Sequence, residues 1–356
     1  MSQTRELLSI PRRLAEIKDF GTGNDLTISA NGKWLACSNA NGEIGVWDAN
    51  SGTAKFRITN TENVESLLFS SDSKWLAAGC LSGKYIAGVW NMVTGEEVAR
   101  LEHKESVQAV AFSPQTDLLA TGGDETIIHI WNIQSWQEEK QFTLKDNLVA
   151  ILFHPTKPYL IAGSSDGLIQ IWNYTTGEKV RVLDNQSSFN YLILSPDGSL
   201  LATKEFMGNV NIWETAGWVK ISEIFEPTVS LAGQAMEFTS DGNFLVLGYG
   251  EFETYGGIRF YSTESGQLVN NIYRSKAVGT LSYSADGKWL GAGGGDYVAG
   301  SRAPSKAWIF KSSTGEQLSW MQCKGTVWKV AFSPSGNTFA TRDDLSIQIW
   351  DILEDQ

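Results

Sequence analysis

Apolar and polar residues alternate along many short stretches of this chain, and each stretch ends in an aromatic residue. Examples are GVWD around Trp47, HIWN around Trp131 and QIWD around Trp350. A period of two places successive side chains on opposite faces, which is the pattern of a packed β-strand. In chain order, these aromatic anchors are Trp47, Trp90, Trp131, Trp172, Trp213, Tyr261, Phe310 and Trp350. The alternation therefore predicts eight strands of one kind.

A second pattern, nine residues long, precedes each anchor. It contains an apolar strand end, a four-residue turn rich in Ser, Pro, Asp and Gly, and the start of another strand, as in FSSDSKWLA and FSPSGNTFA. Its eight copies begin at Ile28, Phe69, Phe112, Phe153, Leu194, Phe238, Tyr283 and Phe332. After most anchors a turn such as TTGE (residues 175–178) leads to a further short strand. The sequence thus predicts eight repeated units of four strands each.

The spacing between units is nearly constant on one side of each anchor and variable on the other. The interval from an anchor to the next nine-residue pattern is identical in six of seven cases, as at positions 47–69 and 90–112. It is longer once, at positions 213–238. The interval from a pattern start to its own anchor is similar in six units and longer in the sixth and seventh, at positions 238–261 and 283–310. We therefore expect the insertions to lie in the turn between the second and third strands of these two units.

The same spacing predicts how the units close into a ring. Counting the constant interval back from Ile28 places residues 13–17 where residues 179–183 lie in unit four, which is a fourth-strand position. The eighth unit lacks its own fourth strand, since the sequence ends shortly after Trp350. We predict that residues 12–18 supply this outer strand, which would seal the ring and leave no innermost edge unpaired.

From about residue 12 to Asp351, these units resemble the repeats of the WD-repeat family, which is named for a Trp-Asp ending like that at Trp350. The resemblance implies an all-β fold. It would be a single eight-bladed WD-repeat β-propeller over residues 1–356, with four antiparallel strands in each blade. Large rings at one repeated position are expected to pack between the twisted blades.

The resemblance also implies a buried network in each blade that joins a His, a Ser or Thr, an Asp and the anchor Trp. Most blades of this chain have lost it. Blade three comes closest, with His103, Thr121 and Trp131, although Glu125 stands where the family has Asp. We therefore interpret His103 as a structural residue rather than a catalytic base.

The composition is typical of a soluble protein made of short strands, and it excludes some classes of partner. Apolar residues make up 42% and charged residues 19% of the chain, and 14 Trp and 35 Gly stand beside 8 Pro. A net charge of −12 opposes broad binding to nucleic acid or anionic lipid, because both need a basic face. No apolar stretch has the length of a membrane span, and the first residues lack an apolar signal core. We expect a cytoplasmic chain with no nucleic-acid partner and no membrane insertion.

Candidate catalytic and metal-binding groups are sparse. We expect His103, His129 and His154 to lie in successive blades at different heights, which predicts no three-ligand metal site. Three widely spaced cysteines fit buried or idle thiols. The glycine run at residues 291–295 follows a strand but opens no helix and lacks a Gly-Lys-Ser/Thr ending, so we interpret it as a long flexible turn. The sequence predicts no catalytic residue, metal or cofactor.

Two insertions provide the best lead to a binding surface. Residues 249–257 and 293–307 should lie on the face that also carries the loops entering each blade. They contain residue types that dominate binding hot spots, namely Phe252, Tyr255, Tyr297 and Arg302. The alternative is that they are loop growth, which a protein surface accepts at little cost.

On the same face, the second residue of each innermost strand is expected to form a ring near the channel mouth. Its members are Asn24, Glu65, Gln108, Val149, Asn190, Gln234, Gly279 and Trp328. Trp328 is either an anchor for a partner or a plug of the channel, and we favour the anchor. The polar members Glu65, Gln108, Asn190 and Gln234 complete the predicted protein-binding site.

These features predict a non-catalytic scaffold or adaptor, monomeric on its own, that binds a peptide or protein on the face with the long turns of blades six and seven. One alternative is a structural subunit of a larger assembly, gripped at its sides or opposite face. Another is a quinone- or metal-dependent propeller enzyme. Such enzymes gather carboxylates or His around the channel, where the predicted ring offers only Glu65.

Overall fold

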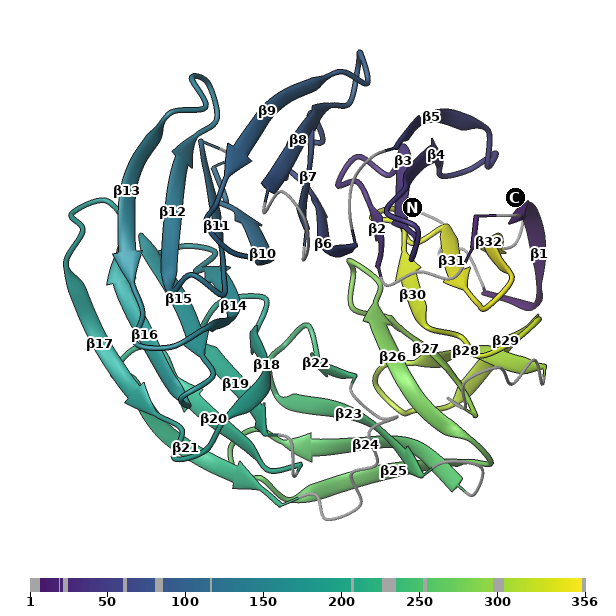
Figure 1. The fold of residues 1–356 in the computed structure, drawn as a ribbon. Helices are drawn as coiled ribbons and strands as arrows, with labels where there is room; N and C mark the ends of the chain where they lie inside the picture. Colours follow the sequence, from purple (N-terminus) through teal and green to yellow (C-terminus); the bar gives the residue numbers. More distant parts are fainter. Residues whose placement is uncertain are drawn as a thin grey trace, which may run out of the picture.

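The chain forms a ring of eight four-stranded sheets around a central axis (Figure 1). The computed structural model describes residues 7–18, 20–21, 25–59, 63–80, 86–115, 117–205, 208–225, 235–251, 255–296 and 304–353. Among these residues, no helix is long and apolar enough to cross a membrane. The predicted all-β, eight-bladed propeller with antiparallel strands is confirmed.

In each blade the strands follow one another outward from the axis. The innermost strands are β2 (Leu26–Ile28), β6 (Val64–Phe69), β10 (Val107–Phe112), β14 (Leu148–Phe153), β18 (Phe189–Leu194), β22 (Met236–Phe238), β26 (Ala277–Tyr283) and β30 (Lys329–Phe332). The second strands are β3 (Trp34–Ser38), β7 (Trp75–Cys80), β11 (Leu118–Gly123), β15 (Tyr159–Ser164), β19 (Leu200–Glu205), β23 (Phe244–Glu251), β27 (Trp289–Gly295) and β31 (Thr338–Arg342). The third strands are β4 (Ile44–Asp48), β8 (Ile86–Asn91), β12 (Ile127–Asn132), β16 (Leu168–Asn173), β20 (Val210–Glu214), β24 (Tyr255–Ser262), β28 (Ser305–Lys311) and β32 (Ser346–Leu353). The outermost strands are β5 (Ala54–Ile58), β9 (Glu97–Glu102), β13 (Glu138–Thr143), β17 (Lys179–Asp184), β21 (Val219–Ile224), β25 (Leu268–Arg274), β29 (Gln317–Cys323) and β1 (Leu7–Lys18).

The nine-residue patterns form tight turns between first and second strands because a side chain binds the turn's own backbone. In blade two, Ser70 Oγ donates to Asp72 Oδ1 at 2.7 Å and accepts the Trp75 N–H at 3.0 Å. In blade four His154 takes the place of the serine, and its Nδ1 accepts the Lys157 N–H at 3.1 Å. These local bonds satisfy backbone groups at the strand ends and fix the hairpins.

The hydrophobic core is divided into eight clusters, and each cluster spans two neighbouring blades. Between blades three and four, Ile128 packs in one cluster with Leu160 and Trp172, whose ring centroid lies 5.1 Å from that of Phe142. Seven of the eight aromatic anchors are buried, and Trp131 is partly buried. The prediction that the anchors pack between blades is confirmed.

The ring closes through β1, which is the outermost strand of blade eight. β1 pairs antiparallel with β32, with Ile17 opposite Ile347, and Arg12 forms an ion pair of 2.6 Å with Asp351. This pairing agrees with the closure predicted for residues 12–18. The prediction was wrong in one respect: β1 covers the outer edge of β32 and no innermost edge, because the sheet order is β1-β32-β31-β30.

A buried arginine links blade eight to blade one. Arg342 Nη1 donates to Cys37 Sγ at 2.8 Å, and Nη2 donates to the Gly21 carbonyl oxygen at 2.6 Å. Burial raises the pKa of the Cys37 thiol to about 12, so this thiol stays protonated beside the guanidinium. Polar contacts therefore reinforce the apolar cluster that joins the two blades.

The insertion of blade six lengthens its strands, which corrects the prediction that it lies in a turn alone. β23 and β24 each have 8 residues, and their ladder continues to the pair Glu251–Tyr255. Gly250 and Gly256 allow this extension, because a Cβ at either position would lie within 2.6 Å of the Ala277 Cα. The sequence pattern could not distinguish a longer hairpin from a longer turn, since both are rich in Gly and Tyr.

The glycine run of blade seven is also a strand, so its interpretation as a flexible turn was wrong. Residues 291–295 lie in β27. A Cβ on Gly291 would lie 2.4 Å from Phe339 Cε2, and one on Gly293 would lie 2.5 Å from Val327 Cγ1. Glycine occurs here because blade eight packs directly against the backbone of blade seven.

Removal of residues 1–18 should lower the melting temperature by roughly 10 °C or more, because it exposes the edge of β32 and the cluster that Ala15 and Ile17 cover. Differential scanning calorimetry measures this change. A synthetic peptide of residues 7–18 should restore part of the lost stability, whereas a scrambled peptide should not. An unchanged melting temperature after the deletion would contradict closure by β1.

Gly294→Ala should reduce the free energy of unfolding by about 2 kcal/mol or more, because its Cβ would lie 2.0 Å from the Ala277 carbonyl oxygen. Gly217→Ala is the matched control, since the nearest atom to its Cβ belongs to the end of the Glu214 side chain and not to the backbone. Urea denaturation of both variants measures the difference. Equal stabilities would show that the backbone at Gly294 has room for a side chain.

Candidate functional site

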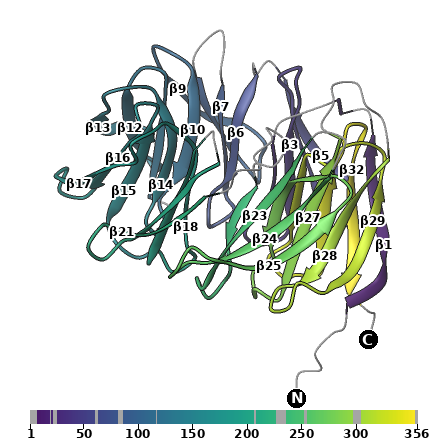
Figure 2. The ribbon, with the colours of Figure 1, turned by 90° about the horizontal axis from the view of Figure 1, so that it is seen from below.

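One face of the ring carries both the loops that enter the blades and the turns between second and third strands. In blade eight the Thr326 N–H donates to Asp344 Oδ2 at 2.8 Å, which joins the entering loop to the turn. In blade seven Lys276 Nζ lies 2.8 Å from Asp296 Oδ2 in the same way. We call this surface the loop face. Figure 2 shows the ring from its side, with strands running between this face and the opposite one.

Trp328 lies on the loop face with its ring exposed and its indole nitrogen bound. Its side chain is 42% exposed, and Nε1–H donates to Asp344 Oδ1 at 2.6 Å. Its backbone N–H donates to the Arg342 carbonyl oxygen at 2.9 Å. The exposed ring is therefore held in one place on the loop face.

The other predicted members of the ring have different environments. Glu65 is exposed, and burial of part of its carboxyl group together with the charge of Asp25 raises its pKa. Gln108 Nε2 donates to Asp124 Oδ1 at 2.6 Å, so that it is engaged within blade three. Asn190 is half-buried, and its Oδ1 has no hydrogen-bond partner among the residues that the structure describes. These positions thus do not form one uniform ring.

Of the predicted residues in the two insertions, the structure describes Tyr255. It begins β24, is 37% exposed, and its ring centroid lies 6.5 Å from that of Tyr249. Tyr249 is buried beneath the Arg259 guanidinium, which lies 3.9 Å from its ring centroid. Phe252, Tyr297, Arg302 and Gln234, like Asn24, lie outside the described residues.

Charged residues that the sequence analysis missed interact inside the ring of innermost strands. Lys329 Nζ lies 3.5 Å from Asp25 Oδ1, and this neighbour is the main reason that the pKa of Lys329 is raised. Tyr191 and Glu237, from two further blades, also interact with the lysine. Asp25, Glu65, Tyr191, Glu237 and Lys329 are called the channel cluster below. The channel cluster contains one cation, Lys329, among several acidic groups.

Glu65 was predicted, but the other four members of the channel cluster were missed because only the second residue of each inner strand was assigned to the channel. Asp25, Tyr191 and Lys329 occupy the third position, and Glu237 the fifth. In β18, as in other inner strands, the register shifts between the first and third residues. The signal available in the sequence was the charge itself, because Glu237 and Lys329 interrupt apolar strands.

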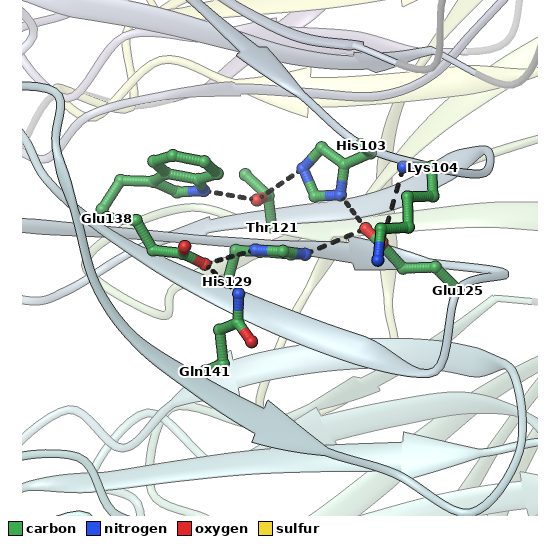
Figure 3. Close-up of polar contacts among 8 residues, drawn as sticks. His103, Lys104, Thr121, Glu125, His129, Glu138 and Gln141 are labelled. Carbon is green, nitrogen blue, oxygen red and sulfur yellow. Dashed lines mark hydrogen bonds and ion pairs between the residues drawn. The ribbon is translucent and has the colours of Figure 1, made fainter.

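A second polar cluster lies in blade three (Figure 3). The Trp131 indole N–H donates to Thr121 Oγ1 at 2.7 Å, and Thr121 Oγ1 lies 2.9 Å from His103 Nε2. The other ring nitrogen of His103 is bound to Glu125 Oε1. This is the network that the sequence predicted, with Glu125 in the place of the family's Asp. Burial lowers the pKa of His103, although its hydrogen bond to Glu125 opposes the shift.

The blade-three network contains a hydroxyl, an imidazole and a carboxylate in the order of a catalytic triad, but its hydroxyl is inaccessible. Thr121 is fully buried and already accepts the Trp131 N–H. A nucleophile must reach its substrate, so this arrangement has a structural role. The three cysteines are also buried, as predicted, and burial raises the pKa of Cys323 to about 12.

His129 joins the same cluster, which corrects the prediction that the histidines lie apart at different heights. Its Nε2 lies 3.0 Å from Glu125 Oε1, and its Nδ1 lies 2.5 Å from Glu138 Oε1. The His103 and His129 ring centroids are 4.7 Å apart. Sequence spacing could not reveal this. His103 lies in the loop that leads into blade three, and only the folded chain brings this loop next to His129 on the third strand. His154 lies separately, in a turn of blade four.

Comparison with known proteins places three segments in one family and the whole ring in one fold. Residues 95–132, 138–173 and 316–351 match the family described as WD domain, G-beta repeat (WD40). A Gallus gallus protein, serine-threonine kinase receptor-associated protein, is 24% identical over 143 residues, covering 40% of this chain and 36% of that protein. The match thus spans about a third of the relative's length. The crystal structure of the computationally designed Ika8 protein superposes with a TM-score of 0.77, at 20% identity, over 96% of this chain and 100% of that one. This last likeness shows the fold alone.

Glu237→Gln should change the pH dependence of stability. Burial raises the pKa of Glu237 to about 7, although Lys329 opposes the shift. The folded protein therefore retains a proton that the unfolded chain loses near pH 4.5, so this stabilisation is present at low pH and is lost as pH rises through 7. At pH 8 the free energy of unfolding of the neutral variant should exceed that of the wild type by on the order of 1 kcal/mol, after discounting for solvent in the channel. At pH 5 the two free energies should be nearly equal. Urea denaturation at both pH values tests this, and a difference independent of pH would contradict it.

Proposed function

Because the chain is a WD-repeat β-propeller, a class that generally serves as non-catalytic scaffold, we propose that it is a protein-binding platform. Its partner is a peptide or a folded protein, and its binding surface is the loop face. The proposal includes no catalytic step. A cytoplasmic location remains a prediction from the sequence.

The exposed indole of Trp328 carries this proposal. Aromatic side chains supply much of the binding energy in protein interfaces, particularly when they are fixed before binding. The bond from Nε1 to Asp344 holds the ring, and Thr326 binds the same carboxylate. Packing within the ring does not require an exposed tryptophan at this place, since the described residues at the same position in other blades are smaller or polar.

The channel cluster supports the same surface. Lys329 directly follows Trp328, and Asp25 and Glu65 belong to the two following blades of the ring. A partner that covers Trp328 would therefore meet charges of both signs at the channel mouth, which provide orientation rather than bulk affinity. The partly similar Gallus gallus protein is, by its name, receptor-associated, which also supports a protein partner.

A second candidate function is that of a structural subunit whose sides bind a partner. Exposed apolar residues on the outer strands favour this function. The outer strands of blades four to seven expose Val180, Val182, Val219, Ile221, Leu268 and Trp320. A pocket of about 650 Å³ between blades six and seven is lined by turns of the face opposite the loop face, including residues 239–241 and 312–315. Exposed apolar side chains on the sides of the ring are groups that a bound partner would cover.

Trp328→Ala and Tyr255→Ala should each reduce partner recovery about tenfold or more, because each removes an exposed aromatic ring from the loop face. Tagged protein is used for capture from native-host extract, and the bound proteins are quantified by mass spectrometry. The matched control is Trp320→Ala, since Trp320 on β29 is 43% exposed and Trp328 is 42% exposed.

The control separates the two candidates. If Trp320→Ala loses partners while Trp328→Ala keeps them, the sides of the ring form the interface and the loop-face proposal fails. Thermal unfolding of each variant must match that of the wild type, so that lost binding is not a loss of folding.

A further inference from the structure

Two histidines of blade three converge on one carboxylate. His103 Nδ1 and His129 Nε2 both bind Glu125 Oε1, the second at 3.0 Å (Figure 3). One nitrogen from each histidine and one oxygen of Glu125 all lie within 4.8 Å of one another. Tetrahedral zinc requires ligand atoms about 3.3 Å apart, which small side-chain rotations would achieve from this arrangement.

The outer nitrogen of each histidine is held by a separate partner. His103 Nε2 lies 2.9 Å from Thr121 Oγ1, which is itself fixed by Trp131. His129 Nδ1 lies 2.5 Å from Glu138 Oε1. Metal-binding histidines generally use their second nitrogen in this way, because it fixes the tautomer and aims the first nitrogen at the metal.

The small number of N–H groups in the cluster also favours a bound cation. A neutral imidazole carries one N–H, yet His129 lies between two carboxylates, those of Glu125 and Glu138. The side chains of His103 and Glu125 are buried, and a buried carboxylate requires compensating positive charge. A divalent cation between the inner nitrogens and Glu125 would supply that charge and leave the N–H of His129 to Glu138.

The propeller fold does not require this convergence. The buried network of blade three already contains Trp131, Thr121, His103 and Glu125, and His129 is additional to it. At the position of His129, two residues before the anchor, the other blades have Gly45, Gly88, Gln170, Asn211, Arg259, Trp308 and Gln348. His129 stacks on the Trp131 ring, with centroids 5.6 Å apart, and it also brings its Nε2 to the Glu125 carboxylate that His103 already binds.

We propose that His103, Glu125 and His129 form a binding site for one zinc ion. Two imidazole nitrogens and one carboxylate oxygen are a ligand set of zinc, whereas calcium and magnesium prefer oxygen alone. Glu138 would orient His129, and a water molecule would complete the tetrahedron. The ion would join the loop at His103 to the turn at Glu125, both of which belong to the loop face.

Isothermal titration of the full chain, purified without a polyhistidine tag, with Zn²⁺ tests the proposal. We expect one ion per chain, and Co²⁺ in its place should give the strong visible bands of four-coordinate cobalt. His129→Gln should weaken Zn²⁺ binding at least about 100-fold, because it removes a ligand yet introduces the residue found at Gln170 and Gln348. His154→Ser is the control: it removes the remaining histidine and restores the Ser or Thr present at this turn position in the other blades, so binding should stay within about twofold.

A second variant distinguishes the loss of a zinc ligand from a folding defect in the first variant. Glu138 is partly exposed, so Glu138→Gln should fold normally and weaken Zn²⁺ binding about tenfold through His129. Absence of Zn²⁺ binding to the wild type, or equal binding by the wild type and both blade-three variants, would overturn the proposal. The spectrum of hydrated cobalt in the presence of the protein would overturn it as well.

Discussion

Each blade of this ring buries its apolar faces only against its two neighbours. Every one of the eight core clusters contains residues from two adjacent blades. A four-stranded sheet alone would leave both faces in water, so the stability of every blade depends on a closed circle. The seam between blades eight and one closes that circle. There the chain combines β1, an apolar cluster and the buried Arg342.

Most of this architecture could be predicted from the sequence because it arises from local repetition. Alternation and the aromatic anchors predict the strands, and the constant interval between an anchor and the next pattern predicts the four-strand unit and its N-terminal completion. Predictions were wrong where distant backbone decides the structure. The glycines at residues 291–295 resemble a turn in sequence, and only the packing of Phe339 and Val327 explains why they form a strand.

The candidate sites were less predictable for the same reason. Trp328 could be found because it departs from the pattern of its position. The channel cluster depends on a register shift in the inner strands, and the pairing of His103 with His129 depends on how a loop folds back onto a blade. Neither arrangement can be predicted from the spacing of residues in the sequence. Residues such as Phe252, Tyr297 and Arg302 lie outside the described structure, so their role stays a prediction from the sequence.

Packing and the proposed functions depend on partly different residues in this molecule. The anchors are nearly all buried between blades, where they hold the ring rigid. Trp328 lies outside the core clusters, whereas Tyr191 of the channel cluster packs against one of them and both blade-three histidines contact the Trp131 ring. All of these residues involve the loop face or the channel beside it. A rigid ring that presents fixed groups on one face binds with little loss of conformational entropy, which suits a protein-binding platform.

Oxidative footprinting of the unmodified chain, with and without its captured partner, tests the binding face most directly. Trp328 and Trp320 are 42% and 43% exposed, so both should be oxidised at comparable rates in the free protein. We expect the bound partner to protect Trp328 and to leave Trp320 reactive. Protection of Trp320 with continued oxidation of Trp328 would contradict it and place the interface on the side of the ring.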